Sequence, residues 1–200
     1  MQAGVIVFTK NPVAGKVKTR LAATVGDQQA LRIYQALLTH TRDVVLQVNA
    51  KRLLFYSEEI IHQDTWPVAF FDKMLQHPGD LGQRMASAFK VGFHTAQPLV
   101  IVGSDCAQLR PSIIEKALAL LATHEMVIGP AMDGGYYLLG MKNFHPEVFD
   151  GIAWSTPQVL EQTLHIIEQQ GWSYAIVDTL SDIDTEADWK KYGWILPDNE

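Results

Sequence analysis

The chain has 200 residues, 48% of them hydrophobic and 19% charged, which is enough for one domain with a full apolar core. Its 22 acidic and 16 basic residues give a net charge of −6, which argues against a general nucleic-acid-binding protein because such proteins carry a basic face. The single cysteine, Cys106, excludes an internal disulfide bond.

The N-terminal sequence predicts a cytoplasmic location. Residues 1–4 lead directly into the apolar run 5–8, without the charged region and cleavage site of a secretory signal. No apolar run approaches the ~20 residues that span a bilayer, so we expect no membrane insertion.

Short apolar runs alternate with amphipathic stretches along the chain, as in βαβ units with a largely parallel sheet. The predicted strands span residues 4–8, 51–56, 68–71, 99–102, 126–128, 136–141 and 173–177. The predicted helices span residues 28–47, 81–94, 111–123, 157–169 and 186–192, the first capped by Asp27 and the second by Asp80. We find no internal repeat and no long linker, so we predict a single α/β domain over residues 1–200.

The order of elements also predicts where ligands bind. In an open parallel sheet the binding crevice lies at the carboxyl ends of the strands. The loops after Phe8, Phe71, Val102 and Ile128 are therefore the candidate functional loops.

The loop after the first strand is cationic. It carries Lys10, Lys16, Lys18 and Arg20 and no acidic residue, although the whole chain is acidic. Gly15 would let backbone N–H groups approach an anion, while the cations supply charge and a bidentate fork. A polyphosphate is the natural ligand for such a loop; a solvated surface loop is the alternative.

Two named phosphate motifs are absent from this loop. A Walker A sequence requires glycine at the position of Lys10 and serine or threonine at the position of Val17. The dinucleotide fingerprint G-x-G-x-x-G is absent as well. We therefore predict neither a P-loop kinase nor a typical NAD enzyme.

Acidic side chains occur at two places that could hold a hard cation. Asp105 follows the buried strand 99–102, and one or two carboxylates suffice for Mg²⁺ when phosphates and water complete its shell. Asp182 and Asp184 alternate in an extended segment, so both would face one side while Ile183 enters the core. Asp184 is the candidate second metal ligand; capping of a turn by Asp105, and of the last helix by Asp184 or its neighbour, is the alternative.

A further anion site is predicted at the start of the helix 81–94. Gly79, Asp80 and Gly82 surround a helix N-terminus, which favours an anion, and Arg84 could reach a phosphate or a base. A plain turn capped by Asp80 is the alternative.

The turn after the strand 126–128 is rich in glycine and aromatic residues. We predict that Asp133 and Gly134 contact a sugar or acceptor hydroxyl, and that Tyr136 or Tyr137 forms an apolar wall. Trp154 would close the same pocket. A simple hairpin turn at Asp133 is the alternative.

Other chemistries lack their motifs. The seven histidines are scattered, with no H-E-x-x-H and no Cys/His cluster, so a zinc site is not expected. There is no G-x-S-x-G elbow of a hydrolase. Cys106 is expected to pack as a small buried side chain rather than to act as a nucleophile.

Taken in order, these motifs resemble those of a bacterial family, DUF2064, described as glycosyltransferase-A-like. The resemblance runs from the first strand to the last helix and rests on the segments 8–12, 15–21, 79–84, 103–106, 133–137 and 182–185. It implies the nucleotide-diphospho-sugar transferase superfamily, with a Rossmann-like three-layer α/β sandwich and a mixed, mostly parallel sheet. It also implies that the cationic loop holds nucleotide phosphates, that Asp105 ligates Mg²⁺ or Mn²⁺, and that Asp184 completes the metal site.

The resulting hypothesis is a metal-dependent transferase that uses a nucleotide or nucleotide-sugar donor and a small-molecule acceptor. In glycosyl transfer an acceptor hydroxyl would attack the anomeric carbon, with Asp133 as candidate base. In nucleotidyl transfer an acceptor phosphate would attack the α-phosphorus, with Lys18 or Arg20 stabilising pyrophosphate. The lone Asp105, where sugar transferases commonly carry D-x-D, also leaves open a non-catalytic nucleotide-binding module. The sequence does not determine the base, the sugar, the acceptor or whether the protein forms a homo-oligomer.

Overall fold

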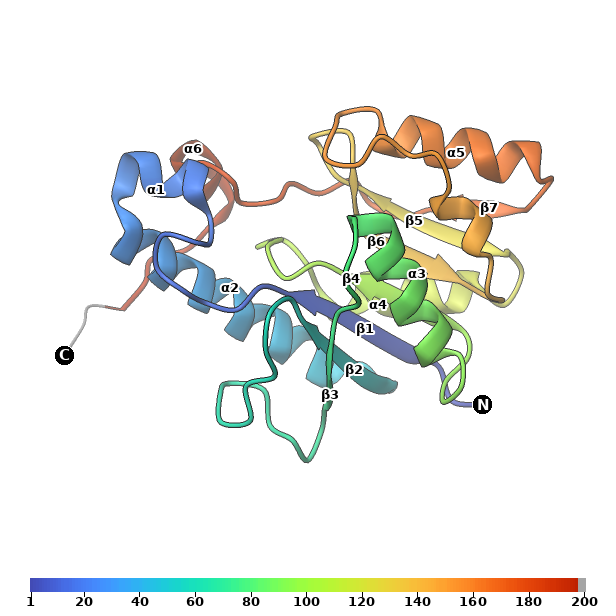
Figure 1. Ribbon diagram of the computed structural model, residues 1–200, viewed down its shortest axis with the longest axis horizontal. Helices are drawn as coiled ribbons and strands as arrows, with labels where there is room; N and C mark the ends of the chain where they lie inside the picture. Colours follow the sequence, from blue (N-terminus) through green and yellow to red (C-terminus); the bar gives the residue numbers. More distant parts are fainter. Residues whose placement is uncertain (198–200) are drawn as a thin grey trace.

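The computed structural model describes residues 1–197 and contains a seven-stranded sheet in the order β3-β2-β1-β4-β6-β5-β7 (Figure 1). Its strands are β1 (Gly4–Thr9), β2 (Lys51–Tyr56), β3 (Asp72–Leu75), β4 (Leu99–Val102), β5 (Met126–Pro130), β6 (Tyr136–Met141) and β7 (Tyr174–Ile176). β6 pairs antiparallel with both β4 and β5, and the other neighbouring strands are parallel. The predicted mixed, mostly parallel sheet is confirmed.

Helices cover both faces of this sheet and complete the predicted three layers. They are α1 (Thr19–Val25), α2 (Asp27–Gln47), α3 (Leu81–Gly92), α4 (Pro111–Leu120), the 3₁₀ turn η1 (Pro146–Phe149), α5 (Val159–Gln169) and α6 (Glu186–Tyr192). α2 and α4 lie on one face, whereas α3, η1 and α5 lie on the other. α1 and α6 lie together beside the start of α2 (Figure 1).

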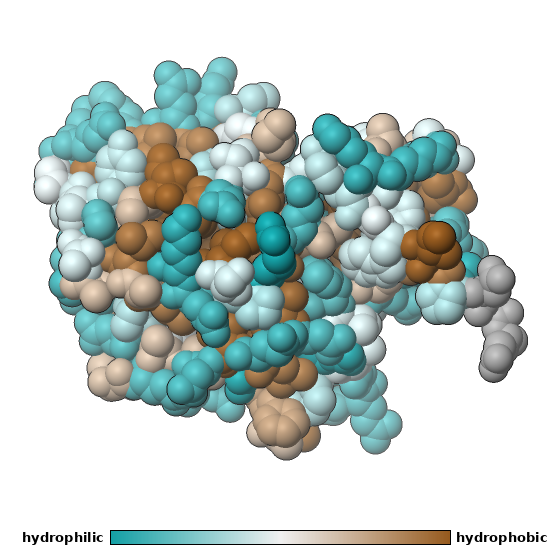
Figure 2. Space-filling view, turned by 180° about the vertical axis from the view of Figure 1, so that it is seen from behind, coloured by the Kyte–Doolittle hydropathy of each residue, from teal (hydrophilic) through white to brown (hydrophobic). Residues whose placement is uncertain are grey.

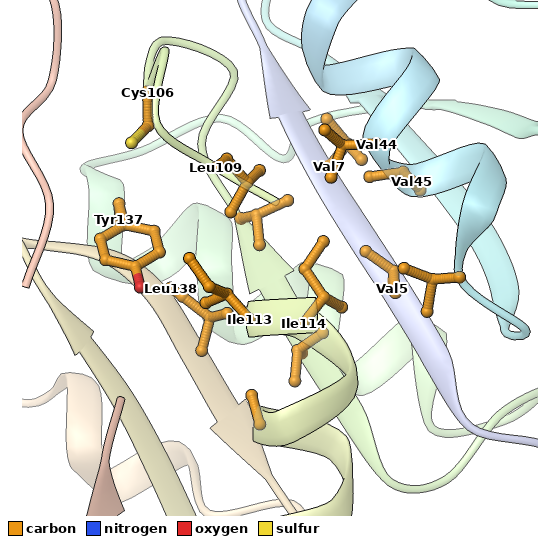
Figure 3. Packing of buried hydrophobic residues seen from close by; sticks show 14 of the residues in the cluster. Val5, Val7, Val44, Val45, Cys106, Leu109, Ile113, Ile114, Tyr137 and Leu138 are labelled. Carbon is orange, nitrogen blue, oxygen red and sulfur yellow. The ribbon is translucent and has the colours of Figure 1, made fainter. Parts of the chain in front are cut away.

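Alternation along the strands divides the apolar core between the two faces. In β1, Val5 and Val7 pack with α2 and α4, while Ile6 packs with α3 on the opposite face. Figure 3 shows Val5 and Val7 beside the valines of α2, with Ile113 and Ile114 of α4 nearby. Because every central strand is covered on both sides, its sequence is a continuous apolar run.

Two predicted features of the first half of the chain are wrong. The third strand is not 68–71 but Asp72–Leu75, because the apolar segment before it anchors a loop: the Phe71 ring packs edge-on against the buried Trp66. Asp27 does not cap α2, since Gly26, with φ +82°, ends α1 and occupies the N-cap position of α2. Asp27 instead lies in the first turn, where its negative charge interacts favourably with the positive end of the helix dipole.

The remaining differences concern helix bounds and short elements. α1 and η1 were not predicted, and α3, α4 and α5 are each two or three residues shorter than expected. The predicted cap of α3 is confirmed: Asp80 Oδ1 accepts from the Gln83 amide at 2.8 Å, and Gln83 Oε1 accepts from the Asp80 amide at 3.1 Å. Within residues 1–197, no helix is long and apolar enough to cross a membrane.

A polar cluster fastens the long loop between β2 and β3. Asp64 accepts from Lys73 Nζ at 2.7 Å and from the Tyr56 hydroxyl at 2.5 Å, and Lys73 also donates to the Ile61 carbonyl at 2.7 Å. The Lys73 side chain is only 5% exposed. The loop is therefore held by a largely buried ion pair as well as by Trp66.

Figure 2 shows one face of the molecule, on which hydrophilic and hydrophobic side chains are interspersed.

Cys106 packs as a small buried side chain, as predicted. It is 1% exposed, and burial, together with the negative charge of Asp182, raises the pKa of its thiol to about 12. The thiol therefore stays protonated across the neutral range, which removes the thiolate needed for nucleophilic chemistry.

We expect the native protein to resist alkylation at pH 8. Iodoacetamide should modify Cys106 at least about 100-fold more slowly in the native protein than in denaturant, because the folded state holds too little thiolate. Mass spectrometry of timed aliquots measures both rates. Comparable rates in the two conditions would contradict the buried, protonated state of Cys106.

Candidate active site

A cavity of about 400 Å³ lies at the carboxyl ends of the central strands, where the topology predicts a ligand site. The parallel strands β1, β2, β3 and β4 all end at this edge. The candidate loop predicted after Phe71 consequently follows Leu75 instead. The polar residues lining the cavity are Thr9, Lys10, Lys18, Thr19, Arg20, Tyr34, Ser57, Gln76, Arg84, Ser104, Asp105, Tyr136, Tyr137 and Asp184.

An ion-pair network joins four of these residues in the cavity. Lys18 Nζ donates to Asp105 Oδ2 at 2.9 Å and to Asp184 Oδ1 at 3.2 Å. Arg20 donates to the other oxygen of Asp184 at 2.6 Å. The Lys18 side chain is 6% exposed, and its backbone is left-handed, with φ 48°, immediately before α1. The structure thus brings together the predicted cationic loop and both predicted metal ligands.

A backbone hydrogen bond joins the loop after β4 to the segment before α6, which lies far away in the sequence. The Ile183 amide donates to the Asp105 carbonyl at 2.9 Å, and the Ile183 side chain is fully buried. Asp184 is thereby held against the loop after β4. Helix α6 is capped by Thr185 in a capping box, which leaves Asp184 to line the cavity.

Mutual attraction keeps Lys18 and Asp105 ionised. Burial alone would lower the pKa of Lys18, but Asp105 and Asp184 raise it well above its usual value. Burial likewise would raise the pKa of Asp105, and the Lys18 ammonium lowers it below its ordinary range. Both groups are therefore charged at neutral pH.

Asp182 is a third carboxylate near this network that was not a predicted site residue. Burial, and next the negative charge of Asp105, raise its pKa well above the usual range. Its Oδ1 is buried without a hydrogen-bond partner among the described residues. Its alternation with Asp184 was visible in the sequence, but its proximity to Asp105 depends on tertiary structure.

Tyr34 of α2 also lines the cavity, and it was not predicted as a site residue from the sequence. Its hydroxyl accepts from the Lys10 amide at 2.9 Å and lies 3.1 Å from the Lys10 carbonyl. The same oxygen lies 3.2 Å from Thr9 Oγ1 and 3.3 Å from Ser104 Oγ. One buried hydroxyl therefore connects the loop after β1 with the loop that carries Asp105.

We expect Tyr34→Phe to lower the free energy of unfolding by about 1–3 kcal/mol, because it leaves the Lys10 amide and the buried hydroxyls of Thr9 and Ser104 with fewer partners. Tyr174→Phe is the matched control, since the Tyr174 hydroxyl donates to Glu168 in an exposed bond. Urea denaturation of the two variants and the wild type gives the comparison. An unchanged midpoint for Tyr34→Phe would contradict the supporting role.

Gln76, another unpredicted lining residue, is fixed by hydrogen bonds to the sheet. Its Nε2 donates to the Thr9 carbonyl at 3.2 Å and to the Phe55 carbonyl at 3.1 Å. No sequence motif marked it, because its partners lie on two other strands.

The predicted phosphate residues of the first loop divide into two groups. Lys10, Lys18 and Arg20 line the cavity. Gly15 and Lys16 do not: Gly15 has φ +76° in a turn, and Lys16 pairs with Glu58 at 3.3 Å on the exposed surface. Their predicted role in phosphate binding stays a prediction.

At the start of α3 only Arg84 of the predicted residues lines the cavity. Its Nε donates to the Gly79 carbonyl at 2.8 Å, which fixes the turn before the helix. Asp80 acts as the cap described above. A Cβ on Gly82 would lie 2.5 Å from the Trp154 ring, so Gly82 allows α3 and Trp154 to pack closely.

The predicted acceptor residues are also dispersed. Tyr136 lines the cavity, whereas Asp133, Gly134 and Trp154 do not. Asp133 is exposed and its Oδ1 accepts from the Gly135 amide at 2.9 Å, the bond of a turn. Gly134, with φ +90°, approaches Pro157 so closely that a Cβ would lie 2.1 Å from its carbonyl oxygen. The roles of these residues toward an acceptor stay predictions.

The donor set at the centre fits a divalent cation. Asp105 and Asp184 each direct one oxygen at the same point, because both contact Lys18 Nζ. Within residues 1–197, no group of three or more His, Cys, Asp or Glu side chains could hold a metal by itself. Two carboxylates sharing a cation with phosphates is the arrangement that Mg²⁺ favours.

Comparisons with known proteins place the fold. The sequence model of the family described as "Uncharacterized protein conserved in bacteria (DUF2064)" matches residues 33–156. No curated protein matches the chain. A solved structure from Desulfovibrio desulfuricans G20, described as a candidate nucleotide-diphospho-sugar transferase, is similar with TM-score 0.86 and 30% identity, over 92% of this chain and 82% of that chain.

Two more distant structures share the fold alone. The 4-diphosphocytidyl-2C-methyl-D-erythritol synthase of Anaerococcus prevotii has TM-score 0.64 and 8% identity, over 96% of this chain and 94% of that chain. The manganese complex of Rv0371C from Mycobacterium tuberculosis has TM-score 0.56 and 14% identity, over 96% and 98%.

Proposed function

Because the chain belongs to the DUF2064 family, we propose that it is a transferase acting on a nucleotide-activated donor, with a nucleotide sugar as the first candidate. The single observation that carries this proposal is the cavity in which cations and carboxylates meet at the carboxyl ends of the strands. The candidate description of the D. desulfuricans protein, at 30% identity, supports the sugar donor.

The cations would bind the diphosphate of the donor. Lys10, Lys18, Arg20 and Arg84 all line one cavity, although the chain as a whole is acidic. Arg20 and Arg84 can form bidentate contacts with phosphate oxygens, while Lys10 and Lys18 act as point charges. In a low-dielectric cleft such fixed charges stabilise the charge that develops on a departing nucleoside diphosphate.

Asp105 and Asp184 would hold Mg²⁺ or Mn²⁺. When bound, this cation would neutralise charge on the phosphates of the donor. The M. tuberculosis structure of the same fold is a complex with manganese.

The acceptor would enter beside β6. Tyr136 lines the cavity and its hydroxyl is buried, so it presents an apolar ring rather than a polar group. Such a wall suits the face of a sugar or a small acceptor and helps to exclude water. Catalysis would then rest on positioning and electrostatic stabilisation, without a covalent enzyme intermediate.

Nucleotidyl transfer is the second candidate, and the number of cations favours it. Four cationic side chains line one cavity, so they could contact several phosphates of a nucleoside triphosphate, and Lys18 or Arg20 could stabilise departing pyrophosphate. In this reaction a phosphorylated acceptor would attack the α-phosphorus of the triphosphate.

Thermal unfolding against a ligand panel tests the proposal. The panel contains nucleotide sugars, nucleoside diphosphates and nucleoside triphosphates, each with and without Mg²⁺ or Mn²⁺. A ligand at 100 times its Kd adds about 2.7 kcal/mol, which raises the Tm of a protein of this size by about 5–10 °C. A metal-dependent shift with a nucleotide sugar or its diphosphate supports glycosyl transfer, and a shift confined to a triphosphate supports nucleotidyl transfer. No shift with any member contradicts the proposal.

A further inference from the structure

We propose that the Lys18 ammonium and a divalent cation compete for the same two carboxylates, so that metal binding requires Lys18 to leave Asp105 and Asp184. The inference rests on the proposed function, because it takes these carboxylates as the metal ligands. It adds a property that the function alone does not require: Lys18 controls when the metal binds.

The geometry makes the two states mutually exclusive. Lys18 Nζ lies 2.9 Å from Asp105 Oδ2 and 3.2 Å from Asp184 Oδ1, so it occupies the point at which both oxygens are directed. A Mg²⁺ ion bonds its oxygen ligands at about 2.0–2.1 Å. A cation bound to the same two oxygens would therefore stand against the positive ammonium of Lys18, whose side chain is only 6% exposed, so solvent screens the repulsion weakly.

The position of Lys18 allows it to move. Lysine side chains have a four-carbon stem with several rotatable bonds, and that of Lys18 lines the cavity. Donor phosphates in the same cavity would offer the ammonium new anionic partners. Lys18 can thus exchange two carboxylates for phosphate oxygens without leaving the site.

A coupling between ligands follows from this exchange. Phosphates that draw Lys18 away from Asp105 and Asp184 raise the affinity for the metal, and the metal raises the affinity for the nucleotide by the same factor. The free protein would bind the metal weakly, and binding would become strong when donor and metal arrive together.

Mn²⁺ binding without nucleotide, followed by the electron paramagnetic resonance signal of free Mn²⁺, tests the competition. We expect Lys18→Gln to bind Mn²⁺ about tenfold more tightly than the wild type, within the usual range of coupling factors. Arg20→Gln is the matched control for charge, since Arg20 donates to Asp184 Oδ2 rather than to the Oδ1 that Lys18 contacts, and its side chain is 71% exposed. It should give a clearly smaller gain, and Lys16→Gln, which alters an exposed pair with Glu58, should give none.

Two results would overturn the inference: a Lys18→Gln affinity no tighter than that of the wild type, or equal gains for Lys18→Gln and Arg20→Gln. Near-ultraviolet circular dichroism checks that each variant is folded. If Lys18→Gln does not fold, a crystal structure of the wild type with Mn²⁺ and a nucleoside diphosphate decides. Manganese between Asp105 and Asp184 with Lys18 Nζ displaced supports competition, whereas manganese there with Lys18 still bridging both carboxylates, or no manganese there, overturns it.

The test separates this inference from the proposed function. The Mn²⁺ comparison needs no nucleotide, so a tighter Lys18→Gln variant supports competition even if the ligand panel finds no donor. Conversely, equal affinities with a positive ligand panel overturn the competition and leave the proposed function intact.

Discussion

Replacement of Asp105 by asparagine is expected to reduce metal-dependent turnover by about 10³-fold, while the protein stays folded. Asparagine keeps the size of the side chain and an oxygen that can accept from Lys18, so the connection to the first loop persists. It removes the negative charge that a divalent cation needs. Steady-state rates at saturating Mn²⁺, once a substrate is identified, measure the effect.

Asp178→Asn is the matched control for this loss of activity. Asp178 lies in an exposed pair with Lys116 at 3.4 Å and does not line the cavity. The same change of chemistry there should leave the rate unchanged. A rate for Asp105→Asn within tenfold of the wild type would remove Asp105 from the proposed metal site.

Replacement of Asp64 by alanine is expected to destabilise the protein by about 3 kcal/mol, because it leaves a buried ammonium without its partner. Lys73 is 5% exposed and Asp64 16% exposed, and the Tyr56 hydroxyl loses the same acceptor. For a protein of this size the loss corresponds to a Tm lower by about 6–12 °C. Differential scanning calorimetry measures it directly.

A comparison of two ion pairs isolates the effect of burial. Asp178→Ala breaks the exposed pair with Lys116, in which both side chains are more than half exposed, and should change stability by less than about 1 kcal/mol. If Asp64→Ala were as mild as Asp178→Ala, the loop between β2 and β3 would not depend on this ion pair.

Most of the fold could be predicted because each central strand carries its own signal. Buried strands such as Leu99–Val102 are continuous apolar runs, and the amphipathic α2 repeats its apolar residues at helical spacing. The third strand was misplaced because Val68 and Phe70 are apolar yet 65% and 58% exposed, whereas the true strand, Asp72–Leu75, is half polar. An edge strand is defined by its pairing with β2, which local sequence does not record.

The site was predictable where topology decides it. Lys10 and Asp105 follow β1 and β4, which end at one edge of the sheet, so the positions of these two strands were enough to predict both as lining residues. The direction of individual side chains could not be predicted. Lys16 pairs with Glu58 at the surface, while Lys18, two residues later, is buried. No sequence motif includes Tyr34, because its hydrogen-bond partners lie 24 and 70 residues away in the sequence.

Phosphorus NMR of the donor identified by the ligand panel, incubated with Mn²⁺ and a pool of small-molecule acceptors, tests the central claim most directly. We expect metal-dependent release of a nucleoside diphosphate, or of pyrophosphate if the reaction is nucleotidyl transfer, and loss of that release in Asp105→Asn. A donor that binds but stays intact with every acceptor would contradict transfer and favour a non-catalytic nucleotide-binding module.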